Sequence, residues 1–250
     1  MKKLPFSTII LAHQHSPALK RAIESMAFAD EIILVDTSGS GAITQKDFPH
    51  CKIETLPVVK NFAQTRNQTL AFAKHDWVFF LDSDEQCVAP NLTKLAALLN
   101  KPPAVYQVKR TDYFLGKPLR FGEPGNTWLI RFVPKAYVEF SGAVHEHILS
   151  PLTAKRIPAN LCTLNHFSHS SVSSFFQKIS WYAKLEAEQR STPLSLVWLE
   201  LAIFPLVKFF YNFVVLAGWL DGVRGLVYAT LMSYHSALVR MYQIEQRLTK

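Results

Sequence analysis

The sequence has few cysteines, no basic cluster and no leader-like apolar run near its start. Cys51, Cys87 and Cys162 lie far apart without the spacing of metal ligands, which argues against a zinc-binding or disulfide-rich scaffold. Lys and Arg are dispersed and no zinc-finger or RNP-like motif occurs, which argues against nucleic acid as a partner. The apolar run at residues 6–11 is too short for a secretory signal, so we expect a reducing, cytoplasmic compartment.

The composition is basic and rich in apolar residues. Of 250 residues 49% are hydrophobic and only 18% are charged, with a net charge of +8. This length suffices for one large domain or for one domain with an appendage. The excess positive charge suits phosphorylated substrates or anionic lipid as partners.

The first hundred residues alternate between strand and helix patterns. Ser16 followed by Pro17 predicts a helix start, because Ser caps helices and Pro fits the first helical position. Strands are expected at residues 6–12, 31–36, 52–58 and 77–81, and further helices at 62–74 and 90–100. Such alternation predicts an α/β fold with a doubly wound, mostly parallel sheet.

The pattern changes after residue 100. Residues 105–110, 127–133 and 161–167 read as strands of a mixed sheet with long loops, and the chain is expected to be helical from Ser173 onward. Residues 197–220 are strongly apolar, but Glu200, Pro205 and Lys208 interrupt them, so they favour helices in a membrane interface over a clean span. A buried helical subdomain is the alternative.

These patterns predict two domains. Residues 1–170 are expected to form an α/β domain, with a doubly wound half at residues 1–100 and a mixed-sheet half at residues 101–170. Residues 171–250 are expected to form a helical, membrane-associated region with apolar helices.

Carboxylates follow the strand at residues 77–81 directly. In open α/β sheets ligands bind beyond the carboxyl ends of the strands, and Asp82 and Asp84 stand at that position. Asp36 ends an earlier strand and is expected to open on the same crevice. Two neighbouring carboxylates repel each other unless a cation joins them, and a hard ion such as Mg²⁺ or Mn²⁺ can share its ligands with a diphosphate. The sequence thus predicts metal-assisted chemistry on a nucleotide.

An ordered set of motifs resembles a known enzyme family. The chain resembles the family 2 glycosyltransferases with the GT-A fold and, among them, the glycosyltransferases of lipopolysaccharide core biosynthesis. The segments that carry the resemblance are residues 21–25 with 29–36, residues 62–67 with Leu70 and Ala73, residues 77–85, Val144-His145-Glu146, and Gly218-Trp219-Leu220-Asp221-Gly222.

The resemblance implies an inverting hexosyltransferase that depends on a metal. It implies that residues 1–170 form the catalytic domain, with residues 1–100 as its nucleotide-binding half and residues 101–170 as its acceptor half. It implies transfer of a hexose, with glucose expected, from a nucleotide sugar, with a UDP-sugar expected, to a lipid-linked lipopolysaccharide core saccharide. The implied location is peripheral, on the anionic cytoplasmic face of a bacterial inner membrane.

The resemblance also implies roles for individual residues. Glu146 is the candidate base that activates the acceptor hydroxyl, with Asp112 and Glu123 in reserve, and Asp82 and Asp84 are the candidate metal ligands. The residues expected to bind the donor and cofactor are Ala12, Gln14, Asp36, Arg66, Asn67, Asp82, Ser83 and His145.

Each assignment has a structural alternative. Asp84 or Glu85 can cap the helix expected near Pro90, and Arg66 and Asn67 can be surface residues of their helix. Glu146 can pair with a neighbouring histidine. Asp221 with its flanking glycines reads equally well as a helix turn.

The chain departs from the family pattern at the donor pocket. Gln14 and His15 stand where the family usually has Asn-Glu, and residues 37–41 lack the family's later acid. Two alternative functions therefore stay open: a family 2 transferase acting on polyprenyl-linked or capsule precursors, and a degenerate homologue that binds a nucleotide without chemistry.

Overall fold

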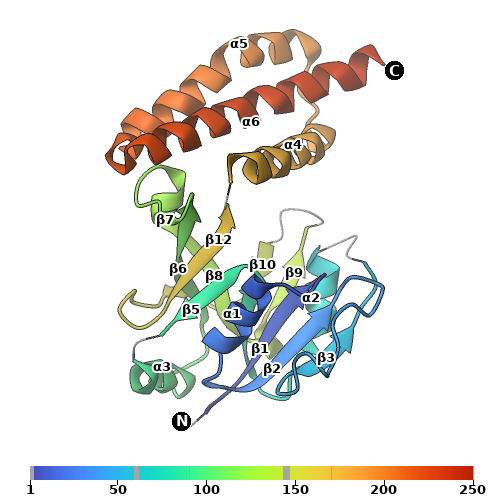
Figure 1. Cartoon of the computed structure of the whole chain (residues 1–250), viewed down its shortest axis with the longest axis vertical. Helices are drawn as coiled ribbons and strands as arrows, with labels where there is room; N and C mark the ends of the chain where they lie inside the picture. Colours follow the sequence, from blue (N-terminus) through green and yellow to red (C-terminus); the bar gives the residue numbers. More distant parts are fainter. Residues whose placement is uncertain (1–2, 59–61, 90, 143–146, 170, 250) are drawn as a thin grey trace. The chain divides into compact units, whose positions relative to one another are not determined.

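The chain folds into two compact units (Figure 1). The computed structural model describes residues 3–58, 62–89, 91–142, 147–169 and 171–249. The first unit consists of Met1–Arg110 and Trp128–His166, and the second of Thr111–Thr127 and Phe167–Lys250. The segment Thr111–Thr127 thus groups with the C-terminal helices, while the domain division expected after residue 170 stays a prediction.

The first unit contains most of the strands. Its helices are α1 (Pro17–Ser25), α2 (Phe62–Leu70), α3 (Leu92–Leu99) and the short η2 (Lys135–Tyr137). Its strands are β1 (Leu4–Ala12), β2 (Ala29–Asp36), β3 (Lys52–Thr55), β4 (Trp77–Asp82), β5 (Glu85–Val88), β8 (Thr127–Pro134), β9 (Glu139–Ser141), β10 (His147–Leu149) and β11 (Ala154–Arg156), with parts of β6 (Val105–Phe114) and β12 (Thr163–His169).

The main sheet has the strand order β3-β2-β1-β4-β8-β6-β12-β5. The four strands β3, β2, β1 and β4 are parallel, β8 joins β4 in the antiparallel sense, and β12 and β5 are also antiparallel. Strand β11 pairs with β6, and β9 with β10 forms a separate small sheet. The predicted architecture is confirmed: a mostly parallel sheet followed by a mixed half and C-terminal helices.

Helices cover both faces of the sheet because its strands are apolar on both sides. On β4, Phe79 and Leu81 belong to one core, and Val78 and Phe80 to the other. The first core includes Leu19 of α1 and side chains of α3, whereas the second includes Ala63 of α2. Continuous apolar strands are typical of sheets buried on both faces.

Local signals set several of the element ends. The Ser16 hydroxyl accepts a hydrogen bond from the Leu19 N–H at 3.1 Å, so the predicted cap of α1 is confirmed. Asn91 caps α3 in the same way through Lys94. The interpretation of Glu85 as a cap of α3 is therefore wrong, because Glu85 instead begins β5, a strand that the sequence did not predict.

The second unit is helical. Its helices are α4 (Val172–Gln189), α5 (Leu194–Phe210) and α6 (Val223–Leu248), joined by η3 (Tyr211–Val215) and η4 (Gly218–Asp221), with η1 (Glu123–Asn126) and strand β7 (Lys117–Pro118) in the preceding segment. One core joins Phe114 and Leu119 to Phe175 and Ile179 of α4 and Leu231 of α6.

The C-terminal glycine-aspartate motif holds the turn between α5 and α6. The Asp221 carboxylate accepts hydrogen bonds from the backbone N–H groups of Arg120 and Phe121, at 3.0 and 2.9 Å. A Cβ atom on Gly225 would lie 1.8 Å from the Gly218 carbonyl oxygen, so only glycine fits where α6 meets η4. These contacts agree with the structural alternative for Asp221.

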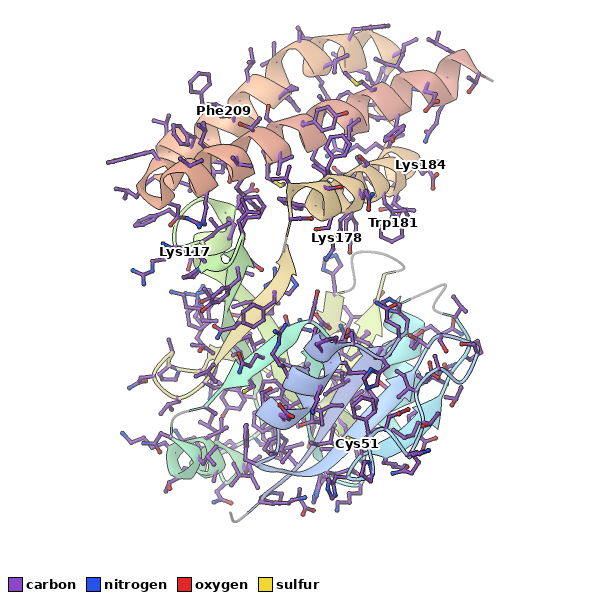
Figure 2. All side chains as sticks on the ribbon, viewed as in Figure 1. Cys51, Lys117, Lys178, Trp181, Lys184 and Phe209 are labelled. Atoms are coloured by element: carbon purple, nitrogen blue, oxygen red, sulfur yellow. The ribbon has the colours of Figure 1, made fainter. Side chains whose placement is uncertain are left out.

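The segment from α5 through η3 is apolar and exposed. Leu194–Val215 has a mean hydropathy of 1.7, and only 6% of its most apolar window is buried. By length and composition it could cross a membrane, although a single such helix is weak evidence. Figure 2 shows the side chains of this segment, with Phe209 labelled.

Candidate active site

The carboxyl ends of the parallel strands bring three predicted residues to one edge of the first unit. Asp82 pairs in register with Leu11 of β1, and the next residue of β1, Ala12, pairs with Asp36 at the end of β2. Ala12 and Asp36 are buried, whereas Asp82 is half-buried. This edge is the crevice in which α/β sheets bind ligands.

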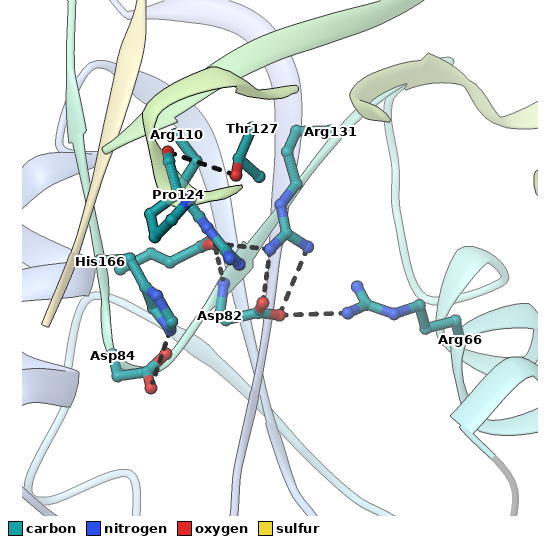
Figure 3. A network of polar contacts seen from close by, with 9 residues as sticks. Arg66, Asp82, Asp84, Arg110, Pro124, Thr127, Arg131 and His166 are labelled. Carbon is teal, nitrogen blue, oxygen red and sulfur yellow. Dashed lines mark hydrogen bonds and ion pairs between the residues drawn. The ribbon is translucent and has the colours of Figure 1, made fainter. Parts of the chain in front are cut away.

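The Asp82 carboxylate is held by two arginines (Figure 3). Arg66 of α2 donates to Asp82 Oδ1 from Nη2 at 3.1 Å, and Arg131 of β8 donates to Oδ2 from its own Nη2. Arg66 also lies over the rings of Phe80 and Phe140, at 5.2 and 5.8 Å from their centroids, which fixes its guanidinium.

Arg131 joins Asp82 to Glu85. Its Nη2 also donates to Glu85 Oε1 at 2.7 Å, and the Glu85 side chain is fully buried. The other Glu85 oxygen accepts the Asp82 backbone N–H at 3.1 Å. Arg110 Nη1 lies 3.8 Å from Glu85, a distance that allows attraction between the charges but no hydrogen bond.

Burial and charge act in opposite directions on these two carboxyls. Burial alone would raise the pKa of Asp82, but the guanidiniums of Arg131 and Arg66 hold it well below its usual value. Burial raises the pKa of Glu85 despite Arg131, and the nearby negative charge of Asp82 adds to that rise. Asp82 is thus the carboxylate that stays ionised.

Asp84 lies beside a histidine. Strand β5 pairs with β12 so that Glu85 faces His166, which brings His166 Nε2 to 3.3 Å from Asp84 Oδ2. About a third of the Asp84 side chain is exposed (34%), whereas His166 is buried (9%). Ser83 is half-buried in the turn between Asp82 and Asp84.

The fit of a divalent ion differs between the two aspartates. Both oxygens of Asp82 accept hydrogen bonds from guanidiniums, so an ion at Asp82 would share these oxygens with Arg66 and Arg131, whose positive charges oppose it. Asp84 and His166 offer an oxygen and a nitrogen in close proximity, and Mg²⁺ commonly takes one or two carboxylates plus substrate phosphates. Among the residues that the structure describes, no group of three His, Cys, Asp or Glu side chains forms a ready metal site. Asp84 with His166 is therefore the candidate position for an ion, which would take its other ligands from a substrate phosphate and water.

Asp36 organises the loop after β2. Its carboxylate accepts the N–H of Ser38 at 2.8 Å and the N–H of Ile43 at 3.2 Å. Burial opposes ionisation of Asp36, but these hydrogen bonds outweigh it and hold the pKa of Asp36 below its ordinary value. Its predicted contact with the nucleoside stays a prediction.

The predicted donor residues differ in their surroundings. The Asn67 amide makes two hydrogen bonds of 2.8 Å to the Phe140 backbone, which fasten α2 to β9. Gln14 is exposed, and His15 stacks on Phe48 with 5.2 Å between the ring centroids. Binding roles for Gln14 and Asn67 remain untested predictions.

The candidate base, Glu146, lies outside the described residues, as does His145. The reserve bases belong to the second unit: Asp112 is buried, and Glu123 forms an ion pair with Lys208 of α5. The Glu123 carboxylate is thus engaged in an ion pair within the second unit.

The sequence patterns did not predict two residues of the site, Arg131 and His166. Arg131 lies between Ile130 and Phe132 in an apolar strand, and a charge there needs a buried partner. That mismatch was the available signal for Arg131. Nothing in the sequence pairs His166 with Asp84, because the contact depends on the register of β5 against β12.

Arg131→Met is expected to lower the free energy of unfolding by about 3 kcal/mol, because it leaves the buried Glu85 and Asp82 without their shared cation. Denaturant unfolding at neutral pH measures the change. The loss should narrow as the pH falls below about 4, where aspartate becomes protonated and needs no cation. The matched control, Arg21→Met on the exposed side of α1, should change stability by less than about 0.5 kcal/mol. Equal effects of the two variants would contradict the bridging role.

Comparisons with known proteins identify the family. The sequence matches the family model of glycosyl transferase family 2 over residues 7–178. A crystal structure of S. aureus TarS residues 1–349 has a TM-score of 0.44 and 13% identity, with 100% of this chain and 92% of that chain covered. A second S. aureus TarS structure has a TM-score of 0.43 and 14% identity, with 98% of this chain and 55% of that chain covered. The mostly parallel α/β sheet is of the GT-A type that the resemblance implied. Since the family match spans more than half of its length, the chain belongs to glycosyl transferase family 2.

Proposed function

We propose that the protein is an inverting, metal-dependent hexosyltransferase of lipopolysaccharide core assembly. Enzymes of this family generally use nucleotide-sugar donors and a divalent metal. The proposed donor is a UDP-hexose, with glucose as the first sugar to test, and the proposed acceptor is a lipid-linked core saccharide. The observation that carries the proposal is the pair Asp82 and Asp84 at the end of β4, with Arg66 and Arg131 around it.

The proposed reaction forms one bond and breaks one. The acceptor hydroxyl oxygen bonds to the anomeric carbon while the bond from that carbon to the diphosphate oxygen breaks, and the diphosphate leaves with the electron pair. The hydroxyl proton passes to the Glu146 carboxylate, which acts as general base. Inversion follows because attack and departure occur on opposite faces of the sugar.

The arginines and the aspartates have different roles in the proposed reaction. Arg66 and Arg131 keep Asp82 ionised and fixed at the edge of the sheet. Asp84 is the proposed ligand of a divalent ion, with His166 beside it, and a bond from Asp82 would share the Asp82 oxygens with the two arginines. When bound, the ion supplies positive charge that stabilises the leaving diphosphate.

The second unit is the proposed membrane contact. Its exposed apolar belt consists of Leu206, Phe210, Val214, Val215, Trp219, Leu220 and Val223, whose side chains are each about half exposed or more. Large exposed apolar patches mark protein or membrane contacts. With the net charge of +8, the belt supports peripheral binding to the anionic cytoplasmic face of a bacterial inner membrane.

Asp84→Asn is expected to weaken Mn²⁺ binding in the presence of UDP by at least about tenfold, because it replaces the proposed carboxylate ligand. Asp82→Asn should weaken Mn²⁺ binding less and lower stability more, since it frees Arg131 and Arg66. Electron paramagnetic resonance of Mn²⁺ measures the affinity without turnover. Unchanged Mn²⁺ binding in an Asp82→Asn, Asp84→Asn double variant would rule out the metal role.

A turnover assay with UDP-sugars and a purified core acceptor tests the function itself. The wild-type protein should add a hexose to the acceptor, and Glu146→Gln should lower kcat by about 10² or more, as expected for loss of a general base. Glu139→Gln, which changes an exposed glutamate on β9, is the matched control and should retain activity. Full activity of Glu146→Gln would remove the proposed base, and absence of transfer from any sugar nucleotide would refute the function.

A double variant tests the membrane contact. Leu206→Gln with Val215→Gln should weaken binding to phosphatidylglycerol vesicles by at least about tenfold, because burial of each apolar side chain contributes about 1.5–3 kcal/mol. Vesicle sedimentation measures the bound fraction. Phe176→Gln on α4, 40% exposed outside the belt, is the matched control and should bind as the wild-type protein does. Equal binding of all three proteins would contradict the proposal.

A further inference from the structure

Residues 115–123 are fastened across the turn between α5 and α6. Besides the two backbone N–H groups that donate to Asp221, the Gly122 N–H donates to the Leu216 carbonyl oxygen at 2.9 Å. These bonds join the segment to η4 and to the residue that follows η3. The segment therefore has a fixed position beside the turn.

The segment begins with a tight hairpin turn between β6 and β7. Leu115 and Gly116, the two residues of the turn, have φ values of 49° and 77°, a pattern typical of a type I′ turn. Glycine adopts positive φ readily, but leucine rarely does. Arg224, the second residue of α6, donates to the Leu115 carbonyl oxygen from Nε and Nη2 at 3.4 Å. Arg224 thus holds the turn that precedes Lys117.

Three cations lie on this fastened surface. Lys117 and Arg120 are exposed, and within the residues that the structure describes their side chains form no ion pair or hydrogen bond. The Arg224 guanidinium bonds to an uncharged carbonyl, so its charge is not cancelled there. We call Lys117, Arg120 and Arg224 the basic rim.

The carboxylates attached to the same segment do not neutralise the basic rim. The Asp221 oxygens accept backbone N–H groups, and Glu123 forms an ion pair with Lys208. Three cations therefore face one remaining carboxylate, and the rim is positive on balance. A surface with an excess of one sign of charge attracts partners of the opposite sign.

The basic rim adjoins the apolar belt. Trp219 and Leu220 of η4 are 55% and 48% exposed and directly precede Asp221, while Val223, 76% exposed, directly precedes Arg224. Tryptophan is enriched at the headgroup level of membranes. Lysine and arginine extend their charged ends from an apolar surface toward lipid phosphates. Both kinds of side chain thus suit the same depth in a bilayer.

We propose that the α5–α6 turn enters an anionic phospholipid surface at headgroup depth and that the basic rim pairs with the lipid phosphates. The inference rests on the proposed membrane contact and adds its lipid class, the residues that recognise the lipid and the end of the second unit that enters first. A second copy of this chain is the less suitable occupant, because a symmetric contact would place one basic rim against another.

Vesicle sedimentation of the full-length protein with two lipid compositions tests the proposal. The vesicles consist of phosphatidylcholine alone or of phosphatidylcholine and phosphatidylglycerol in equal amounts. The wild-type protein should bind the mixed vesicles at least about tenfold more tightly, because each Lys or Arg near an anionic surface favours binding by roughly fivefold. Added salt should remove most of this preference, since it screens exposed charges.

Variants locate the lipid contact. Lys117→Gln with Arg120→Gln should lower affinity for the mixed vesicles by at least about tenfold and leave affinity for phosphatidylcholine unchanged. Arg224 is retained, because its loss would also loosen the hairpin turn.

The matched control is Lys178→Gln with Lys184→Gln, which removes the same charge from α4 and should keep the preference for the mixed vesicles. Figure 2 shows Lys178 and Lys184 on α4 and Lys117 at the end of the unit that holds the α5–α6 turn. Thermal melts establish that both double variants are folded.

Equal losses of affinity in the two double variants would overturn the inference, because net charge rather than the basic rim would then set the lipid preference. A wild-type protein that binds both vesicles alike would also overturn it and would leave the proposed membrane contact standing. A wild-type protein that binds neither vesicle would refute the membrane contact as well, and a dimer in light scattering would then assign the belt to a second copy. Binding is measured without turnover, so none of these results bears on the proposed sugar transfer.

Discussion

The site depends on one buried guanidinium, that of Arg131, which lies between Asp82 and Glu85. The carboxylates of Asp82 and Glu85 lie close together and repel each other, and the Glu85 side chain is fully buried. Without a cation between them, the turn after β4 would be destabilised by unpaired buried charge. Arg66 completes the neutralisation from α2. This arrangement holds Asp82 at the end of β4, whereas Asp84 lies beside His166.

The same arrangement separates two sides of the site. On one side, β1 and β2 end at Ala12 and Asp36, and Asp36 uses its carboxylate to shape the loop after β2. On the other side lies an arginine-lined cavity between β6, β8 and β10.

The sequence predicted the fold better than it predicted the site. Apolar strands, the Ser16 cap and the strand–helix alternation are local signals, and the structure confirms the α/β architecture that they indicate. The contacts of Arg131 and His166 depend on how β8 meets β4 and how β12 meets β5, and register between distant strands leaves little local trace. Strand β5 was missed for a related reason: four residues with two polar side chains carry too short a pattern.

Arginines hold Asp82, and we propose that Asp84 binds an ion together with a diphosphate. Anomalous diffraction from a crystal grown with Mn²⁺ and UDP measures this directly. We expect a manganese peak beside Asp84 and the UDP phosphates, with Asp82 still bound to Arg131. A manganese peak on Asp82 with Arg131 displaced, or UDP bound away from the end of β4, would contradict it.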